Sequence, residues 1–226
     1  MRCADREIEI YSQGDGEVKS LVICNGMKDE GKAIFARCQK LGCHDFILAH
    51  IAIEDWNRDL SPWPAPPVFG KQSFAGKADD HLKKLKEDIV PFILEQTDEK
   101  ISSVYLAGYS LAGLFALYSA FNCDLFDGIA SVSGSLWYPD LDEYIRTHKI
   151  SDRIKKIYFS LGDKENKTKN PLMATVADKT EMISQLLSER IETIYEINEG
   201  DHFKDPDLRV AKGIRWLLRN PADPDA

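Results

Sequence analysis

The fold is indicated most directly by residues 104–113, which read Val104-Tyr105-Leu106-Ala107-Gly108-Tyr109-Ser110-Leu111-Ala112-Gly113. The first four residues form an apolar, β-rich run, and apolar side chains recur at helical spacing after Ser110. A serine between such a strand and such a helix lies on a tight turn, where small residues two positions before and after it prevent a collision. Gly108 and Ala112 occupy those positions. The segment therefore predicts a strand, a turn that carries Ser110, and a helix.

Ser110 can be interpreted in two ways. A serine at the start of a helix often only caps the free backbone amides. A serine lifted above a sheet by a tight turn can instead act as a nucleophile, because the amides and the dipole of the helix N-terminus favour a developing oxyanion. The strand before Ser110 and the helix after it favour the nucleophile.

The rest of the chain alternates strands with helices. Apolar, β-rich runs occupy about residues 46–53, 103–107, 128–133, 156–161 and 191–197, and helical patterns occupy about residues 31–41, 76–96, 110–121, 139–148, 171–190 and 205–219. Such alternation predicts a mostly parallel central sheet with helices on both faces. Two earlier strands, at about 7–11 and 18–24, are separated by a glycine-containing turn at 13–16 and predict an antiparallel N-terminal hairpin.

Length and composition predict the organisation of the chain. Its 226 residues predict one α/β domain over about residues 1–220, followed by a frayed polar tail at 221–226. A proline-rich loop at 56–69 is too long to be a simple connection, and whether it forms a lid stays open. The net charge of −8 opposes binding to nucleic acid, and no run of residues is apolar enough for a membrane span. Five cysteines without a C-x-x-C pair favour a reduced, cytoplasmic location.

Three segments together resemble a known family. They are residues 108–113 quoted above, Asp55-Trp56-Asn57-Arg58-Asp59-Leu60-Ser61-Pro62-Trp63-Pro64, and Gly200-Asp201-His202-Phe203 before the last helix. The whole chain resembles the α/β-hydrolase superfamily, in the esterase branch that includes esterase D, enterochelin esterases and feruloyl esterases. The commonest form of the serine turn has glycine where this chain has Ala112, but alanine also fits there. The resemblance implies an α/β-hydrolase fold and a serine hydrolase.

The family order of serine, acid and histidine locates the other catalytic candidates. This order excludes His44, His50 and His81, which precede Ser110. His148 lies among polar residues at the end of a helical pattern and is interpreted as a surface residue. His202 follows the last predicted strand and is the expected base.

The acid of the triad should follow the strand at 156–161, where Gly162-Asp163-Lys164-Glu165 offers two carboxylates. In related esterases the acid stands a few residues past the glycine that ends this strand, which favours Glu165 and keeps Asp163 as the alternative. The carboxylate would accept a hydrogen bond from the imidazole and stabilise the imidazolium.

The resemblance implies hydrolysis of a small ester through an acyl-enzyme, without a metal or an organic cofactor. The Leu111 amide and a second amide near Gly26 or Met27 are the expected oxyanion donors. The expected pocket walls are aromatic: Trp56, Trp63, Trp137 and Tyr138. The oligomeric state stays open.

Other functions remain as alternatives. A siderophore lactone is a second possible substrate, and a catalytically silent binding protein with the same fold is a third possibility. Residues 26–33 also approach the phosphate-loop pattern G-x-x-x-x-G-K-[ST] and are followed by an apolar run that ends at Glu54-Asp55. Ala33 lacks the hydroxyl that binds magnesium, and Asp29 and Glu30 would repel phosphate. A nucleotide-binding protein is therefore the weakest alternative.

Overall fold

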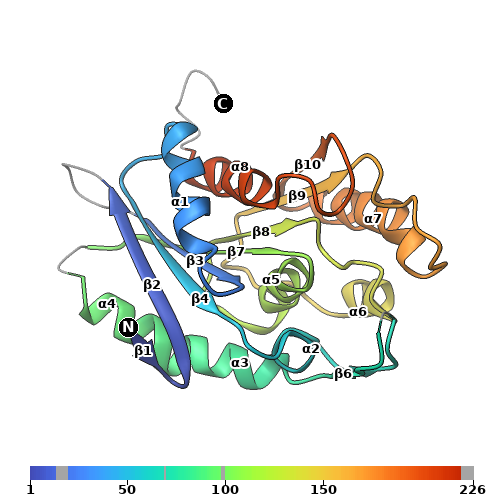
Figure 1. The fold of residues 1–226 in the computed structure, drawn as a ribbon, viewed down its shortest axis with the longest axis horizontal. Helices are drawn as coiled ribbons and strands as arrows, with labels where there is room; N and C mark the ends of the chain where they lie inside the picture. The colour runs from blue at the N-terminus through green and yellow to red at the C-terminus, as the bar shows by residue number, and fades with distance from the viewer. Residues whose placement is uncertain (14–19, 69, 98–99, 220–226) are drawn as a thin grey trace.

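A computed structural model describes residues 1–13, 20–68, 70–97 and 100–219 of the chain. Within these residues, the main sheet has the strand order β1-β2-β4-β3-β7-β8-β9-β10 (Figure 1). Its strands are β1 Arg2–Cys3, β2 Arg6–Gln13, β3 Ser20–Gly26, β4 Phe46–Ala52, β7 Ser103–Tyr109, β8 Gly128–Val132, β9 Lys156–Gly162 and β10 Glu192–Asn198. All neighbours from β4 to β10 run parallel, so the predicted sheet is confirmed.

The sheet has antiparallel strands at its N-terminal edge, as predicted, but these are β1 and β2, and β3 runs parallel to its neighbours. β2 pairs with β1 and with β4, whereas β3 lies between β4 and β7, so the expected pairing of 7–11 with 18–24 is wrong. Leu21, Val22 and Ile23 of β3 are fully buried, and a strand that is apolar on both faces belongs in the centre of a sheet. The alternating polar residues of β2 suit a place nearer the edge. Residues 14–16 of the predicted turn lie outside the described residues.

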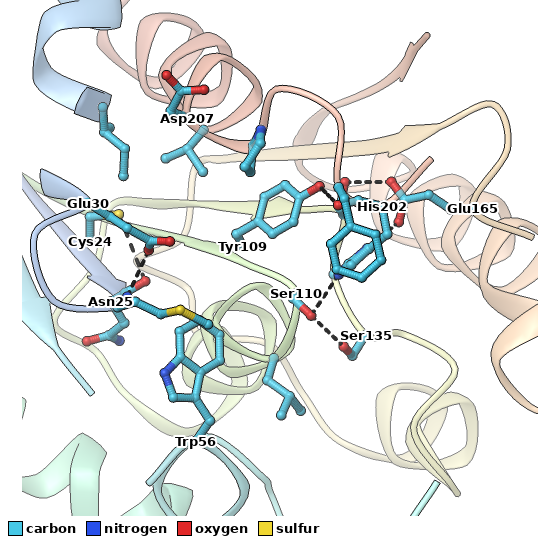
Figure 2. Close-up of a pocket in the computed structure, with 18 of the residues that line it drawn as sticks. Cys24, Asn25, Glu30, Trp56, Tyr109, Ser110, Ser135, Glu165, His202 and Asp207 are labelled. Carbon is cyan, nitrogen blue, oxygen red and sulfur yellow. Dashed lines mark hydrogen bonds and ion pairs between the residues drawn. The ribbon is translucent and has the colours of Figure 1, made fainter. Parts of the chain in front are cut away.

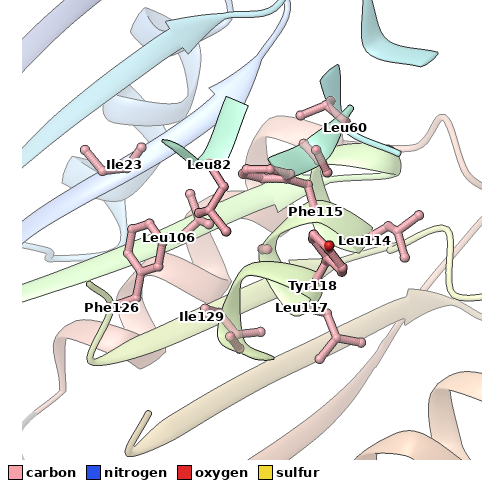
Figure 3. Close-up of a cluster of buried hydrophobic side chains, with 14 of the residues drawn as sticks. Ile23, Leu60, Leu82, Leu106, Leu114, Phe115, Leu117, Tyr118, Phe126 and Ile129 are labelled. Carbon is pink, nitrogen blue, oxygen red and sulfur yellow. The ribbon is translucent and has the colours of Figure 1, made fainter. Parts of the chain in front are cut away.

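The helices cover both faces of the sheet. Successive residues of each central strand point to opposite sides, so neighbouring residues pack against different helices. Val22 packs in one apolar cluster with α1 (Gly31–Lys40) and α8 (Pro206–Leu218). Its neighbour Ile23 packs in the other cluster, shown in part in Figure 3. That second face is covered by α3 Ala78–Lys84, α4 Val90–Glu95, α5 Leu111–Asn122, α6 Leu141–Thr147 and α7 Val176–Ser188.

Two of the predicted helices are subdivided. The pattern at 76–96 forms α3, a π-helical turn (Leu85–Ile89) and α4. Pro91 lacks an amide hydrogen and its ring would crowd the preceding turn of a regular helix, and the wider π turn comes just before it. The pattern at 171–190 begins with a short 3₁₀ turn (Met173–Thr175) and continues as α7. No helix among the described residues is long and apolar enough to cross a membrane.

The proline-rich loop is held against the body of the protein. It begins with the short helix α2 (Trp56–Asp59), and its strand β5 (Pro64–Ala65) pairs with β6 (Phe74–Ala75). The Trp63 indole donates a hydrogen bond to the carbonyl of Pro139 at 3.1 Å, and the Tyr138 hydroxyl donates to the carbonyl of Trp63 at 2.6 Å. Phe69 of this loop and residues 221–226 of the expected tail lie outside the described residues.

Candidate active site

Ser110 lies on a strained turn at the carboxyl end of β7, immediately before α5. Its φ of 58° and ψ of −120° are unusual for a residue with a side chain, and its amide donates to the carbonyl of Val132 at 3.0 Å. A Cβ atom on Gly108 would approach the backbone of Ala112 to 2.4 Å, so the strand and the helix come as close as the sequence predicted. The turn places the Ser110 hydroxyl above the sheet (Figure 2).

His202 lies in the loop between β10 and α8, where its imidazole reaches Ser110. The distance from His202 Nε2 to Ser110 Oγ is 3.1 Å, and that from His202 Nδ1 to Glu165 Oε2 is 2.6 Å. Because a carboxylate can only accept, Nδ1 donates to Glu165, and Nε2 of a neutral ring accepts from the serine hydroxyl. The Tyr109 hydroxyl donates to the carbonyl of His202 at 2.6 Å and holds the loop in place.

Glu165 is a buried carboxylate with several hydrogen-bond donors. Its side chain is 3% exposed, and its second oxygen, Oε1, accepts from the Gly162 amide at 2.7 Å and the Ser133 hydroxyl at 2.7 Å. Burial alone raises the pKa of Glu165, but the hydrogen bond and charge of His202, with these donors, outweigh it and lower the pKa overall. The group is therefore held in its ionised form beside the imidazole.

Asp163, the alternative acid, faces a different partner. Its Oδ1 accepts a hydrogen bond from the Gly200 amide at 2.6 Å, and its own amide donates to the carbonyl of Asn198 at 2.8 Å. Asp163 thus joins the loop after β9 to the loop after β10, while the structure brings Glu165 and not Asp163 to His202.

Arg209 is a site residue that the sequence analysis missed. It is 2% exposed, and its Nη1 donates to Glu165 Oε1 at 2.9 Å. Its Nη2 donates to the carbonyls of Glu199 at 3.0 Å and Asp201 at 2.9 Å, in the loop that carries His202. The available signal was an arginine within the apolar pattern of the last helix, beside Val210 and Ala211.

The expected oxyanion donors differ in their surroundings. Leu111 follows Ser110 directly in the first turn of α5 and lines the same pocket. Met27 also lines the pocket, but its amide donates to Glu30 Oε2 at 2.8 Å. Gly26 is not one of the lining residues; a Cβ there would approach Nε2 of His50 to 2.5 Å. Of the three expected donors, Leu111 therefore combines a place in the pocket lining with a position directly after Ser110.

A pocket of about 690 Å³ opens beside Ser110 and is mostly apolar. Figure 2 shows Ser110, His202 and Glu165 along one wall and Glu30, Asn25 and Cys24 across from them. Of the expected aromatic residues, Trp56 and Trp137 line this pocket. Trp63 and Tyr138 do not line it; their rings pack edge to face against each other, with centroids 5.8 Å apart.

The alternative of a phosphate-binding loop receives no support from the local geometry. The Glu30 carboxylate accepts from the Met27 amide, which is the kind of donor that a phosphate would need. Asp55, at the end of the apolar run that follows this loop, caps α2 by accepting from the Arg58 amide at 3.0 Å. Within the described part of the chain, no three histidine, cysteine or acidic side chains are grouped as metal ligands.

Comparison with solved structures identifies proteins of the same fold. An IroE-like serine hydrolase from Shewanella oneidensis superimposes with a TM-score of 0.78 at 19% identity, covering 94% of this chain and 75% of that protein. The siderophore hydrolase EstA from Aspergillus nidulans superimposes with a TM-score of 0.72 at 19% identity, covering 94% and 89%. At these identities the likeness concerns the fold, which confirms the predicted α/β-hydrolase architecture.

Comparison of sequences identifies the family. YbbA of Bacillus subtilis (strain 168) is 28% identical over 149 residues, which is 63% of this chain and 60% of YbbA. The match therefore spans less than two thirds of that relative. A family described as "Putative esterase" matches residues 33–205, which include the strand, turn and helix around Ser110 and the loop of His202. Because this match covers well over half of the sequence, the chain belongs to the putative esterase family.

Proposed function

We propose that the protein is a serine esterase that hydrolyses small carboxylic esters through an acyl-enzyme. The observation that carries the proposal is the continuous chain from Ser110 Oγ through the His202 ring to Glu165, with distances of 3.1 Å and 2.6 Å. Membership of an esterase family supports the choice of an ester as substrate.

In the first half of the proposed reaction, the Ser110 oxygen attacks the ester carbonyl carbon while His202 Nε2 takes the serine proton. The carbonyl oxygen becomes an oxyanion, for which the Leu111 amide is the proposed donor. The tetrahedral intermediate then collapses. Its bond to the alcohol oxygen breaks, and His202 returns the proton to the leaving alcohol, so that an acyl group remains on Ser110.

In the second half, water replaces the alcohol. His202 Nε2 takes a proton from the water, the resulting nucleophile attacks the acyl carbon, and the bond to Ser110 Oγ breaks as the proton returns to the serine. Glu165 stabilises the imidazolium in both halves, because its carboxylate faces Nδ1 and its lowered pKa keeps it charged. Arg209 positions Glu165 without touching the reacting atoms.

The test combines covalent labelling with turnover. A fluorophosphonate probe should label the wild-type protein, and the wild type should release p-nitrophenol from a short-chain ester. Ser110→Ala should abolish the labelling and reduce turnover by about 10³-fold or more. Ser188→Ala is the matched control, because it removes an exposed hydroxyl at the end of α7, outside the pocket, and should leave labelling and turnover unchanged. Labelling that persists in Ser110→Ala would contradict the proposal.

A further inference from the structure

Glu30 is a carboxylate of the pocket that the proposed reaction does not use. It precedes α1 and faces the pocket across from Ser110 and His202 (Figure 2). Its Oε2 accepts one hydrogen bond, from the Met27 amide at 2.8 Å. Loss of water around the carboxyl group raises the pKa of Glu30, and the nearby charge of Asp207 acts in the same direction. A cation beside Glu30 would relieve both effects.

The other acidic residues of the pocket already have cationic partners. Glu165 is paired with Arg209 and contacts His202, and Asp207 is paired with Arg37 at 2.8 Å. Among the described residues, Glu30 forms no ion pair, and no lysine or arginine lines the pocket. The pocket therefore contains one carboxyl group without a cationic partner among the described residues.

Two neighbours of Glu30 provide further contacts for a ligand. Asn25 also lines the pocket and is 1% exposed, and its Nδ2 has no hydrogen-bond partner among the described residues. A buried donor without a partner is costly. Trp56 lies beside the same space, and an indole face attracts cations. A carboxylate without an ion pair, a donor without a partner and an aromatic ring thus line the same pocket.

We propose that Glu30 is a specificity-determining residue that binds a positively charged group, an ammonium or a quaternary ammonium, of the ester substrate. The proposal rests on the proposed esterase function, because it places the scissile carbonyl at Ser110 and the cation against the opposite wall. The apolar lining between the two walls would contact the carbon chain that joins them. The same carboxylate disfavours anionic esters.

The test compares esters that differ only in charge. One pair has the charge in the acyl group: the p-nitrophenyl ester of γ-(trimethylammonio)butyrate and its tert-butyl isostere. The other pair has it in the alcohol: butyrylcholine and its tert-butyl isostere. In at least one pair, the wild type should favour the cationic ester by about fivefold or more in kcat/KM, and added salt should reduce this ratio. Glu30→Gln should bring the ratio close to one, since glutamine keeps the shape and an acceptor for Met27.

A matched control and a charge reversal complete the experiment. Glu54→Gln removes an exposed carboxylate outside the pocket and should keep the wild-type ratio. Glu30→Lys should reverse the preference between cationic and neutral esters. A wild type without cation preference in either pair, or a preference that survives Glu30→Gln, overturns the assignment of Glu30.

Failure of the esterase proposal gives a different result. In that case neither neutral nor cationic esters are hydrolysed and the fluorophosphonate probe does not label Ser110. Calorimetry with hexyltrimethylammonium then tests the cation site without turnover. Binding to the wild type that is weakened by Glu30→Gln supports the site, and equal binding to the two proteins, or none, overturns it.

Discussion

Arg209 Nη1 lies 2.9 Å from Glu165 Oε1, on the oxygen of the carboxylate that does not face His202. Both side chains are nearly inaccessible, at 2% and 3% exposure. The arginine also donates to two carbonyls of the loop that carries His202. A single side chain thus fixes both the proposed acid and the loop of the proposed base, so its loss should affect stability and catalysis together.

Arg209→Met should therefore be strongly destabilising and nearly inactive. It leaves Glu165 buried without its guanidinium partner, and breaking a buried pair typically costs about 3–5 kcal/mol in the free energy of unfolding. Urea unfolding measures this loss.

Arg209→Lys should keep the charge and recover part of the stability, but kcat should stay reduced because one ammonium cannot replace the planar guanidinium. Lys212→Gln, on the same helix but paired with Glu196, is the control and should retain kcat. Full activity in Arg209→Met would contradict the positioning role.

The two candidate acids can be separated by isosteric substitutions. Glu165→Gln removes the charge beside His202 and should reduce kcat by about 10³–10⁴-fold with little change in KM. Asp163→Asn keeps an acceptor for the Gly200 amide, as the 2.6 Å hydrogen bond requires, and should lower kcat by no more than a few fold. Steady-state kinetics on one p-nitrophenyl ester decides the matter. The reverse ranking of the two variants would assign the acid to Asp163.

Local patterns made much of this architecture predictable. Ser110 and its small neighbours are close in sequence, so the strand, turn and helix could be inferred from one segment. The pairing of β2 could not, because its partner β4 is distant in the chain and both β3 and β4 offer apolar edges. The alternating pattern of β2 indicated a strand but not its neighbour.

Residues that act through long-range contacts were also beyond local patterns. Arg209 stands in an amphipathic helix, where an arginine usually indicates a solvated face, but its acceptors come from four other segments, at the ends of β7, β8, β9 and β10. Trp63 and Tyr138 were expected in the pocket because they are aromatic and lie near its segments. Whether such a ring faces a pocket or the core depends on packing between loops far apart in the sequence.

The free energy of unfolding should fall steeply as the pH is lowered, because two histidines are buried. Burial lowers the pKa of His50 to about 4 and that of His81 to about 3, from the ordinary value of 6.5. Below pH 6.5 the unfolded chain binds protons that the folded protein does not, so the stability present at neutral pH is lost as the pH falls from 6.5 towards these values. Each histidine adds a slope of about 1.4 kcal/mol per pH unit.

Urea unfolding at several pH values between 4 and 7 measures that slope. The range ends at pH 4 because the pKa of His50 in the folded protein is about 4. His50→Gln should reduce the slope by about 1.4 kcal/mol per pH unit, which is the contribution of one proton, even if it lowers stability at neutral pH. The same substitution at exposed His44 should keep the steep slope. A slope that His50→Gln leaves unchanged would show that His50 does not become protonated on unfolding.

The close approach of β7 and α5 should make Gly108 intolerant of any side chain. An added Cβ would lie 2.4 Å from the carbonyl carbon and oxygen of Ala112, and backbone atoms cannot move aside without displacing the turn that holds Ser110. Gly108→Ala should therefore lower the free energy of unfolding by about 2–3 kcal/mol. It should also reduce fluorophosphonate labelling of the folded fraction. Gly213→Ala, on α8, is the control, because the nearest atoms to its Cβ would be side-chain atoms of Ala130 and Tyr158 in the sheet, at 3.0 Å. It should cost less stability and leave labelling intact. Equal labelling of the two folded variants would mean that the turn can shift without moving the Ser110 hydroxyl away from His202.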